Sequence, residues 1–149
     1  MTRLSDLELT AWQALLHAHD KVMKLLDAEL RDRCDIGLGD YDVLVRLAQA
    51  PDGRLKMTDL AQRAMLSPSS LTRVVDRLVE RQLVGRDRST ADNRVVHASL
   101  TDAGRTRARA AARIHLRGIR EHFTSLLTDD QLRGVGDALE VIAGPHEPH

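Results

Sequence analysis

Hydroxyl and guanidinium side chains, which donate hydrogen bonds, gather between residues 67 and 77 of this 149-residue chain. A helix start is predicted there, because a capping hydroxyl at Ser67 precedes Pro68, whose backbone suits the first helical position. Apolar residues follow at helical spacing on one face, and the other face carries hydroxyl and arginine side chains together with Asp76 and Glu80. A helix fits the DNA major groove when its outer side chains are short or flexible and donate hydrogen bonds. We therefore expect DNA contacts from Ser67, Ser69, Ser70, Thr72, Arg73 and Arg77.

Arg73 is the residue expected to read sequence, because a guanidinium can form two parallel hydrogen bonds with a guanine edge. Ser69, Ser70 and Arg77 are expected to make phosphate or mixed contacts, since hydroxyls and amides at a helix N-terminus suit phosphate oxygens. An ordinary solvated helix face also presents serine and arginine. The neighbouring elements favour the DNA interpretation.

A basic β-hairpin is predicted directly after this helix, because two segments with alternation and β-branched residues flank a turn-rich stretch. The first strand is expected at residues 83–88, the turn at 89–93 and the second strand at 94–100. Arg86, Arg88 and Arg94 lie on the arms and beside the tip, where a guanidinium could enter the narrow minor groove. Asp92 either serves the turn or holds Arg94 by a charge-assisted hydrogen bond, and the sequence leaves both roles open.

Two helices are predicted before this unit. Thr58 and Asp59 predict the start of a short helix that extends to about Ala64. Asp40 can cap the helix before it, which a turn-forming stretch stops at residues 51–53. Short helix, turn, amphipathic helix and hairpin then follow in the order of a winged helix-turn-helix.

Long helices flank this unit at both ends. From Leu4, apolar residues recur every three or four positions and predict a helix of about 28 residues. Gly37 and Gly39 are expected to end it. Because the helix carries two apolar stripes, part of it is expected to meet another subunit.

The region after the hairpin predicts two more helices. Thr101 caps the first, which is expected to run to about Leu127. Thr128 and Gln131 have the spacing of a capping box, which opens a last helix. That helix is expected to end at about Ala143. The predicted fold is therefore mainly α, with a small β-hairpin wing and long dimerisation helices at both termini.

The length suits one hydrophobic core, so we expect one domain over residues 6–143. We expect the dimerisation helices at about 5–35 and 101–143, and the helix-turn-helix at about 57–81. The wing is expected at about 83–100 and the tail at 144–149.

Composition narrows the classes of function. The 22 basic and 22 acidic residues balance, yet residues 51–100 carry nine basic against six acidic side chains. Aromatic residues make up only 2%, which argues against stacking on single-stranded nucleic acid. Cys34 is the only cysteine, so an internal disulfide is excluded. No membrane span or secretory signal is visible, and we expect a cytoplasmic protein.

The stretch from Leu44 to Arg105 resembles the MarR family of bacterial transcriptional regulators. The family's recognition helix and wing entry resemble SPSSLTRVVDRLVERQLVGR, and its wing tip, second wing strand and next helix start resemble DNRVVHASLTDAG. The resemblance implies a homodimer with interleaved terminal helices that binds a pseudo-palindromic operator, mostly as a repressor. Gln82 departs from the pattern, because the family commonly has glycine there, and a left-handed backbone would cost about 1 kcal/mol.

The resemblance also implies a small aromatic or anionic ligand that releases the DNA. An apolar pocket with one or two polar groups could hold it, although each candidate residue could equally pack in the core or the dimer interface. The candidates are Trp12, Leu16, Met23, Tyr41, Leu44 and Met65. The arginine-rich run at residues 105–120 could contact phosphate or pair with acidic residues of a partner's first helix.

The sequence thus predicts a dimeric, sequence-specific regulator of double-stranded DNA. No enzyme is expected, because no nucleophile with a base, paired carboxylates or metal site occurs at telling spacing. No cofactor is expected either. The histidine pairs lack the spacing that favours a shared metal ion, so none is assigned. Two alternatives remain, a winged-helix module that binds protein and a redox-sensing regulator that uses Cys34.

Overall fold

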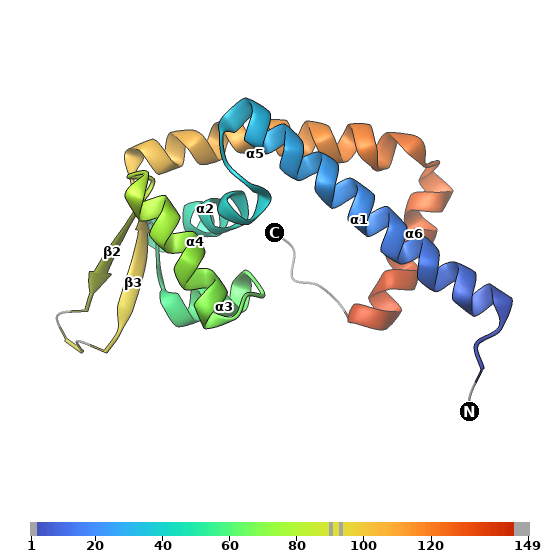
Figure 1. Cartoon of the computed structure of the whole chain (residues 1–149), viewed down its shortest axis with the longest axis horizontal. Helices are drawn as coiled ribbons and strands as arrows, with labels where there is room; N and C mark the ends of the chain where they lie inside the picture. Colours follow the sequence, from blue (N-terminus) through green and yellow to red (C-terminus); the bar gives the residue numbers. More distant parts are fainter. Residues whose placement is uncertain (1–2, 90, 93, 145–149) are drawn as a thin grey trace.

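The longest helix of the computed structural model is α1 (Asp6–Cys34), and the structure describes residues 3–89, 91–92 and 94–144. The remaining elements are α2 (Leu38–Gln49), η1 (Pro51–Gly53), β1 (Arg54–Lys56), α3 (Met57–Arg63), α4 (Pro68–Glu80), β2 (Val84–Arg88), β3 (Val96–Leu100), α5 (Asp102–His122), η2 (Thr124–Leu126) and α6 (Asp129–Ala143). Figure 1 shows α2, α3, α4 and the β2–β3 hairpin gathered at one end, with α1, α5 and α6 forming an arm. The predicted fold class is confirmed. The tail at 145–149 and the wing residues at 90 and 93 lie outside the described residues.

Hydroxyl side chains cap the helices that position the lobe and the arm. In α4, Ser67 accepts the Ser70 N–H at 3.2 Å, which satisfies one of the free amides of the first turn. Thr101 caps α5 in the same way. Thr128 and Gln131 form the reciprocal capping box of α6. These three predicted helix starts are confirmed.

The junction between α1 and α2 differs from the prediction. The first helix ends at Cys34, where Asp35 adopts a left-handed backbone with φ 54°, and not at the two glycines. Gly37 precedes α2 as its N-cap, and Gly39 lies inside that helix. Asp40 is the third residue of α2 and accepts the Gly37 N–H, so it assists the start of the helix without being the cap. Aspartate tolerates the left-handed region well enough to end a helix without glycine.

Two further elements correct the sequence interpretation. The helix α5 ends at His122 and not near Leu127, because Phe123 leaves the helical region and the short η2 follows. A third strand, β1, joins the predicted hairpin, and the sheet order is β1-β3-β2 with both pairs antiparallel. Leu55 of β1 lies opposite Ala98 of β3. The extra strand ties the wing to the chain segment that leads into α3.

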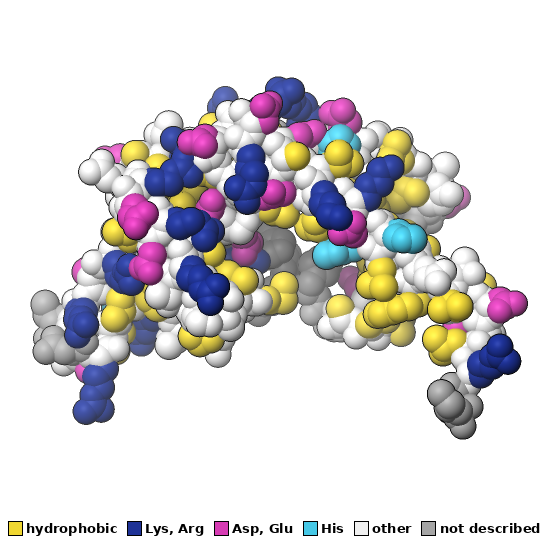
Figure 2. Space-filling view, in the orientation of Figure 1, with side chains coloured by type: hydrophobic (Ala, Val, Ile, Leu, Met, Phe, Trp, Pro, Cys, Tyr) yellow, Lys and Arg dark blue, Asp and Glu magenta, His cyan; other side chains and the backbone are white. Residues whose placement is uncertain are grey.

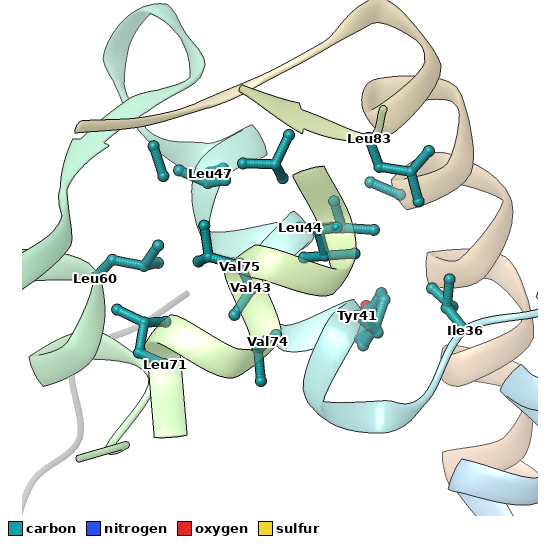
Figure 3. Close-up of a cluster of buried hydrophobic side chains, with 14 of the residues drawn as sticks. Ile36, Tyr41, Val43, Leu44, Leu47, Leu60, Leu71, Val74, Val75 and Leu83 are labelled. Carbon is teal, nitrogen blue, oxygen red and sulfur yellow. The ribbon is translucent and has the colours of Figure 1, made fainter. Parts of the chain in front are cut away.

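A single apolar core fixes the lobe. Leu44 and Leu47 of α2, Leu60 of α3 and the inner face of α4 meet there, as Figure 3 shows. The inner face of α4 consists of Leu71, Val74, Val75 and Leu78. Full burial of each such side chain contributes about 1.5–3 kcal/mol. Because this face is committed to the core, the opposite face of α4 must point outward.

The arm leaves large apolar side chains uncovered. Every residue of α1 up to Lys21 is exposed, including Trp12 at 54%. Near the end of α6, Val141 and Ile142 are exposed at 87% and 77%. Figure 2 shows apolar surface concentrated around this end of the molecule. Across the described part of the chain, no helix combines the length and apolarity needed to cross a bilayer.

Candidate nucleic-acid interface

The turn between α3 and α4 sets the angle at which α4 is presented. Met65 stands in this turn with a left-handed backbone of φ 52°, and the Leu66 N–H donates to the Ala61 carbonyl at 3.0 Å. This hydrogen bond closes the C-terminus of α3 and turns the chain into the cap of α4. The turn is short, and the inner face of α4 packs into the core directly after it.

The first turn of α4 presents a cluster of exposed hydroxyl groups. Ser67 Oγ donates to Ser70 Oγ at 2.8 Å and lies 3.3 Å from Ser69 Oγ. Thr72 Oγ1 donates to the Pro68 carbonyl at 2.8 Å. These groups surround the N-terminus of a 13-residue helix, where the backbone dipole favours anions. The arrangement is chemically suited to phosphate oxygens.

Arg73 lies on the outer face of α4 and is exposed. Among the residues that the structure describes, its guanidinium has no hydrogen-bond or ion-pair partner. Arg77 is one turn further along and donates to the buried Asp40 at 2.9 Å, while 56% of the Arg77 side chain stays exposed. The two predicted contact residues therefore differ, because Arg73 is free to move and Arg77 is anchored.

The arginines of the wing differ in the same way. Arg86 pairs with Asp76 of α4, which joins the wing to that helix. Arg88 and Arg94 are exposed, and neither guanidinium has a partner within the described ranges. Figure 2 shows basic side chains along the lobe and down to the hairpin end. Arg88 and Arg94 are thus available to a negative ligand, whereas Arg86 already contacts a carboxylate.

Asp92 orders the wing turn through the backbone. Its Oδ1 accepts the Arg94 N–H at 3.0 Å, and its carbonyl accepts the Val95 N–H at 3.0 Å. The Ser89 N–H donates to the Val95 carbonyl at 2.9 Å and closes the hairpin end. This is turn chemistry of the kind that aspartate favours. The contact is made to the Arg94 backbone, and the role of Asp92 in orienting the wing stays a prediction.

The predicted ligand-pocket residues are not gathered in one place. Tyr41 and Leu44 are buried in the lobe core, and Met65 is 87% exposed in the turn before α4. Trp12 and Leu16 are exposed on the distal half of α1, and Met23 is partly buried nearer the lobe. The single chain therefore supplies no shared cavity for the set.

Cys34 is buried at the C-terminus of α1. Its carbonyl accepts a hydrogen bond from Arg107 Nη1 at 2.7 Å, which links α1 to α5. An open cavity of about 350 Å³ adjoins it and is lined by Asp32, Arg33, Cys34, Asp35, Arg107 and Ala110. An oxidant would have to reach a thiol that is largely covered.

Sequence reasoning missed the acidic residues that anchor α4. Asp40 holds Arg77, Asp35 pairs with Arg81 at 2.9 Å, and Asp76 pairs with Arg86. The first two carboxylates lie more than 35 positions from their partners in the sequence. No local spacing rule could have found them.

Comparison with known proteins agrees with this geometry. The sequence model of the MarR family matches residues 37–96. The HTH-type transcriptional repressor MdtR of Bacillus subtilis (strain 168) is 24% identical over 129 residues, which are 87% of this chain and 78% of MdtR. AbsC, a MarR family transcriptional regulator from Streptomyces coelicolor, is 31% identical with a TM-score of 0.89, and the match covers 96% of both chains.

Sco3205, another MarR family transcriptional regulator from Streptomyces coelicolor, was solved in complex with DNA. It is 30% identical to this chain with a TM-score of 0.90, and the match covers 99% of this chain and 93% of Sco3205. Identity at this level over nearly the whole of both chains, together with the lobe and wing described above, identifies the chain as a member of the MarR family of DNA-binding transcriptional regulators.

Proposed function

We propose that the protein is a homodimeric repressor that occupies a pseudo-palindromic operator through two copies of the α4 and wing surface. The observation that carries the proposal is the outer face of α4, where the capping hydroxyls and Arg73, which has no partner among the described residues, point away from the core. A protein-binding winged helix predicts an apolar outer face at this position, whereas this face is polar and carries hydroxyls and arginines together with Asp76 and Glu80. The relatives named above include a repressor and a protein crystallised with DNA.

A dimer is supported by the uncovered apolar surface of the arm. Leu7, Trp12, Val141 and Ile142 are exposed in the single chain, and burying a patch of this kind is the usual basis of a homodimer interface. Two-fold related copies of α4 about 34 Å apart would enter successive major grooves on one side of the duplex. A dimer bound there excludes other proteins from the operator, which is how occupancy represses.

In this proposal the exposed side chains contact different parts of the DNA. Arg73 reads a base edge, the hydroxyls of Ser67, Ser69, Ser70 and Thr72 position the helix on phosphates, and Arg94 with Arg88 reaches from the wing. Arg77 and Arg86 contact DNA only with the part of each guanidinium that their carboxylate partners leave free. The expected small aromatic or anionic ligand stays a prediction, as does the cytoplasmic location.

The test is a binding selection from random duplex DNA with the full-length protein, combined with sedimentation equilibrium. We expect a dimer at working concentration and enrichment of an inverted repeat whose half-sites are centred about 10 base pairs apart. A chain that sediments only as a monomer would refute the dimer, and a dimer that enriches no repeat would refute the operator. Repeating the selection with a panel of small aromatic acids tests ligand release.

A further inference from the structure

A histidine and a glutamate meet where α1 crosses α5. His122 Nε2 lies 2.6 Å from Glu29 Oε1, and both side chains are partly buried. The second carboxylate oxygen, Glu29 Oε2, is buried and has no hydrogen-bond partner among the described residues. A buried carboxylate oxygen without a partner costs free energy, so native structures normally supply one. The neighbouring groups indicate what could neutralise this carboxylate.

Gly118 explains why this oxygen is shut away from water. A Cβ atom at Gly118 would lie 2.8 Å from Glu29 Oε2 and 2.6 Å from Leu26 Cδ2. Because Gly118 has no side chain, α1 packs directly against the backbone of α5 at this point. The Glu29 carboxylate is therefore pressed against the α5 backbone, beside His122.

Glu121 supplies a third group on the open side of the pair. One ligand atom from each of Glu29, Glu121 and His122 lies within 4.8 Å of the others. Glu121 is exposed, and its carboxylate has no side-chain partner in the part of the chain that the structure describes. Two carboxylates and an imidazole form a donor set that binds zinc and similar divalent ions of the first transition row.

We propose that Glu29, Glu121 and His122 form a binding site for a divalent ion of the zinc class, with water in the remaining position. The charge balances, because the two carboxylates together neutralise a doubly charged ion. Such an ion would bind Glu29 through Oε1, would neutralise its carboxylate, and would clamp α1 to α5 just before η2. The site is independent of the DNA-binding surface and of the proposed function.

The rearrangement needed for binding is small. Around a tetrahedral ion with bonds of about 2.0–2.2 Å, ligand atoms lie roughly 3.3 Å apart. His122 Nε2 and Glu29 Oε1 must therefore move apart slightly from 2.6 Å, and the exposed Glu121 must turn inward. The ion takes the place of the hydrogen between Nε2 and Oε1, and a neutral imidazole then carries its proton on Nδ1.

The sequence could not predict this site, because 93 positions separate Glu29 from His122. Metal sites read from sequence depend on ligands at short helical spacing. Here only the adjacent pair at 121 and 122 is local. From the sequence no metal ion is predicted, and this proposal revises that prediction.

The test is a Zn²⁺ titration of untagged, EDTA-treated protein, followed by calorimetry and by the visible absorption of Co²⁺ as a substitute ion. The background carries His146→Gln and His149→Gln, so that the tail cannot contribute ligands. Glu121→Gln removes the exposed ligand without disturbing the buried pair, and His122→Gln removes the imidazole. His19→Gln, an exposed histidine of α1, is the matched control.

We expect one ion per chain and a Zn²⁺-dependent rise in melting temperature. Loss of a metal ligand should weaken binding by more than the roughly 10- to 100-fold that follows loss of a ligand's hydrogen-bonding partner. Glu121→Gln and His122→Gln should both show this loss, and His19→Gln should not. Equal affinity in Glu121→Gln and its parent, or no binding in the tail-substituted background, would show that Glu29 and His122 are only an ion pair.

Discussion

Arg77 of α4 donates a hydrogen bond from Nη2 to Asp40 Oδ1 of α2 across 2.9 Å. The other oxygen of the same carboxylate accepts the Gly37 N–H at 3.0 Å. Asp40 is buried and Arg77 is about half exposed, so the carboxylate is the fixed member of the pair. One side chain thus supports the start of α2 and also fixes where α4 stands relative to it.

Asp40→Ala should lower the free energy of unfolding by about 1–3 kcal/mol, because two charge-assisted hydrogen bonds are lost at a buried position. Urea denaturation measures this change. Asp42→Ala is the matched control, since the hydrogen bonds that the described residues make to the Asp42 side chain come from Arg46 within the same helix. Such pairs contribute about 0.2–0.5 kcal/mol. Equal losses in the two variants would contradict the role given to Asp40.

Arg73→Ala should relax base preference at one position of each half-site. The guanidinium is exposed and unpartnered among the described residues, so its removal leaves the fold intact. We expect about 1–3 kcal/mol less discrimination between the preferred and the substituted base, measured by competition between operator variants. Arg133→Ala, in α6, serves as the control. A uniform loss of affinity across all operator variants would make Arg73 a phosphate contact.

Much of the fold could be predicted because its signals are local. Ser67, Thr101 and Thr128 begin helices through hydrogen bonds within three residues, which sequence spacing reveals. At Gln82, where the related family commonly has glycine, the question was whether the backbone is left-handed. The structure shows that it is, with φ 59°. The three-residue strand β1 was missed, because alternation needs a longer run before it is visible.

The site was less predictable, because its partners are distant in sequence. The outer face of α4 followed from helical periodicity, and the structure keeps that face exposed. The anchoring of Arg77 by Asp40 depends on how α2 packs against α4, which no spacing rule contains. The pocket set of Trp12, Tyr41 and Met65 failed to gather in the single chain for the same reason.

Arg94→Ala should weaken operator binding without changing the dimer or its melting temperature. The side chain is exposed and has no partner among the described residues, whereas its backbone N–H donates to Asp92. If the guanidinium neutralises one phosphate or enters the minor groove, the slope of log K against log salt should become shallower by about 0.9. Fluorescence anisotropy over a salt series gives this slope. An unchanged affinity and slope would remove the wing tip from DNA binding.

Asp92 should act on DNA only through the shape of the wing. Asp92→Ala removes the oxygen that accepts the Arg94 N–H at 3.0 Å, so this turn hydrogen bond is lost and binding should weaken by less than in Arg94→Ala. Asp92→Asn keeps an Oδ1 acceptor and should restore binding. Operator affinity of the two variants separates the possibilities. Failure of asparagine to rescue would mean that the negative charge itself matters.

His115 should make stability depend on pH near neutrality. Burial lowers the pKa of His115 below its usual 6.5, and the Asp42 carboxylate offsets part of this. The ring packs against Tyr41, and its buried Nδ1 has no partner among the described residues. As pH falls below about 6.5, His115 takes up a proton in the unfolded chain before it does so in the folded one. The free energy of unfolding therefore decreases as pH falls from about 6.5 through the lower pKa of the folded state.

The unfolding free energy of the wild type should therefore fall more steeply between about pH 7.5 and 5.5 than that of His115→Gln. Urea denaturation at several pH values measures both curves. His19→Gln should keep the wild-type slope, because His19 is exposed in the single chain. Parallel curves for the wild type and His115→Gln would show that the folded protein accommodates the protonated ring. Protonation of His115 would then not lower the free energy of unfolding.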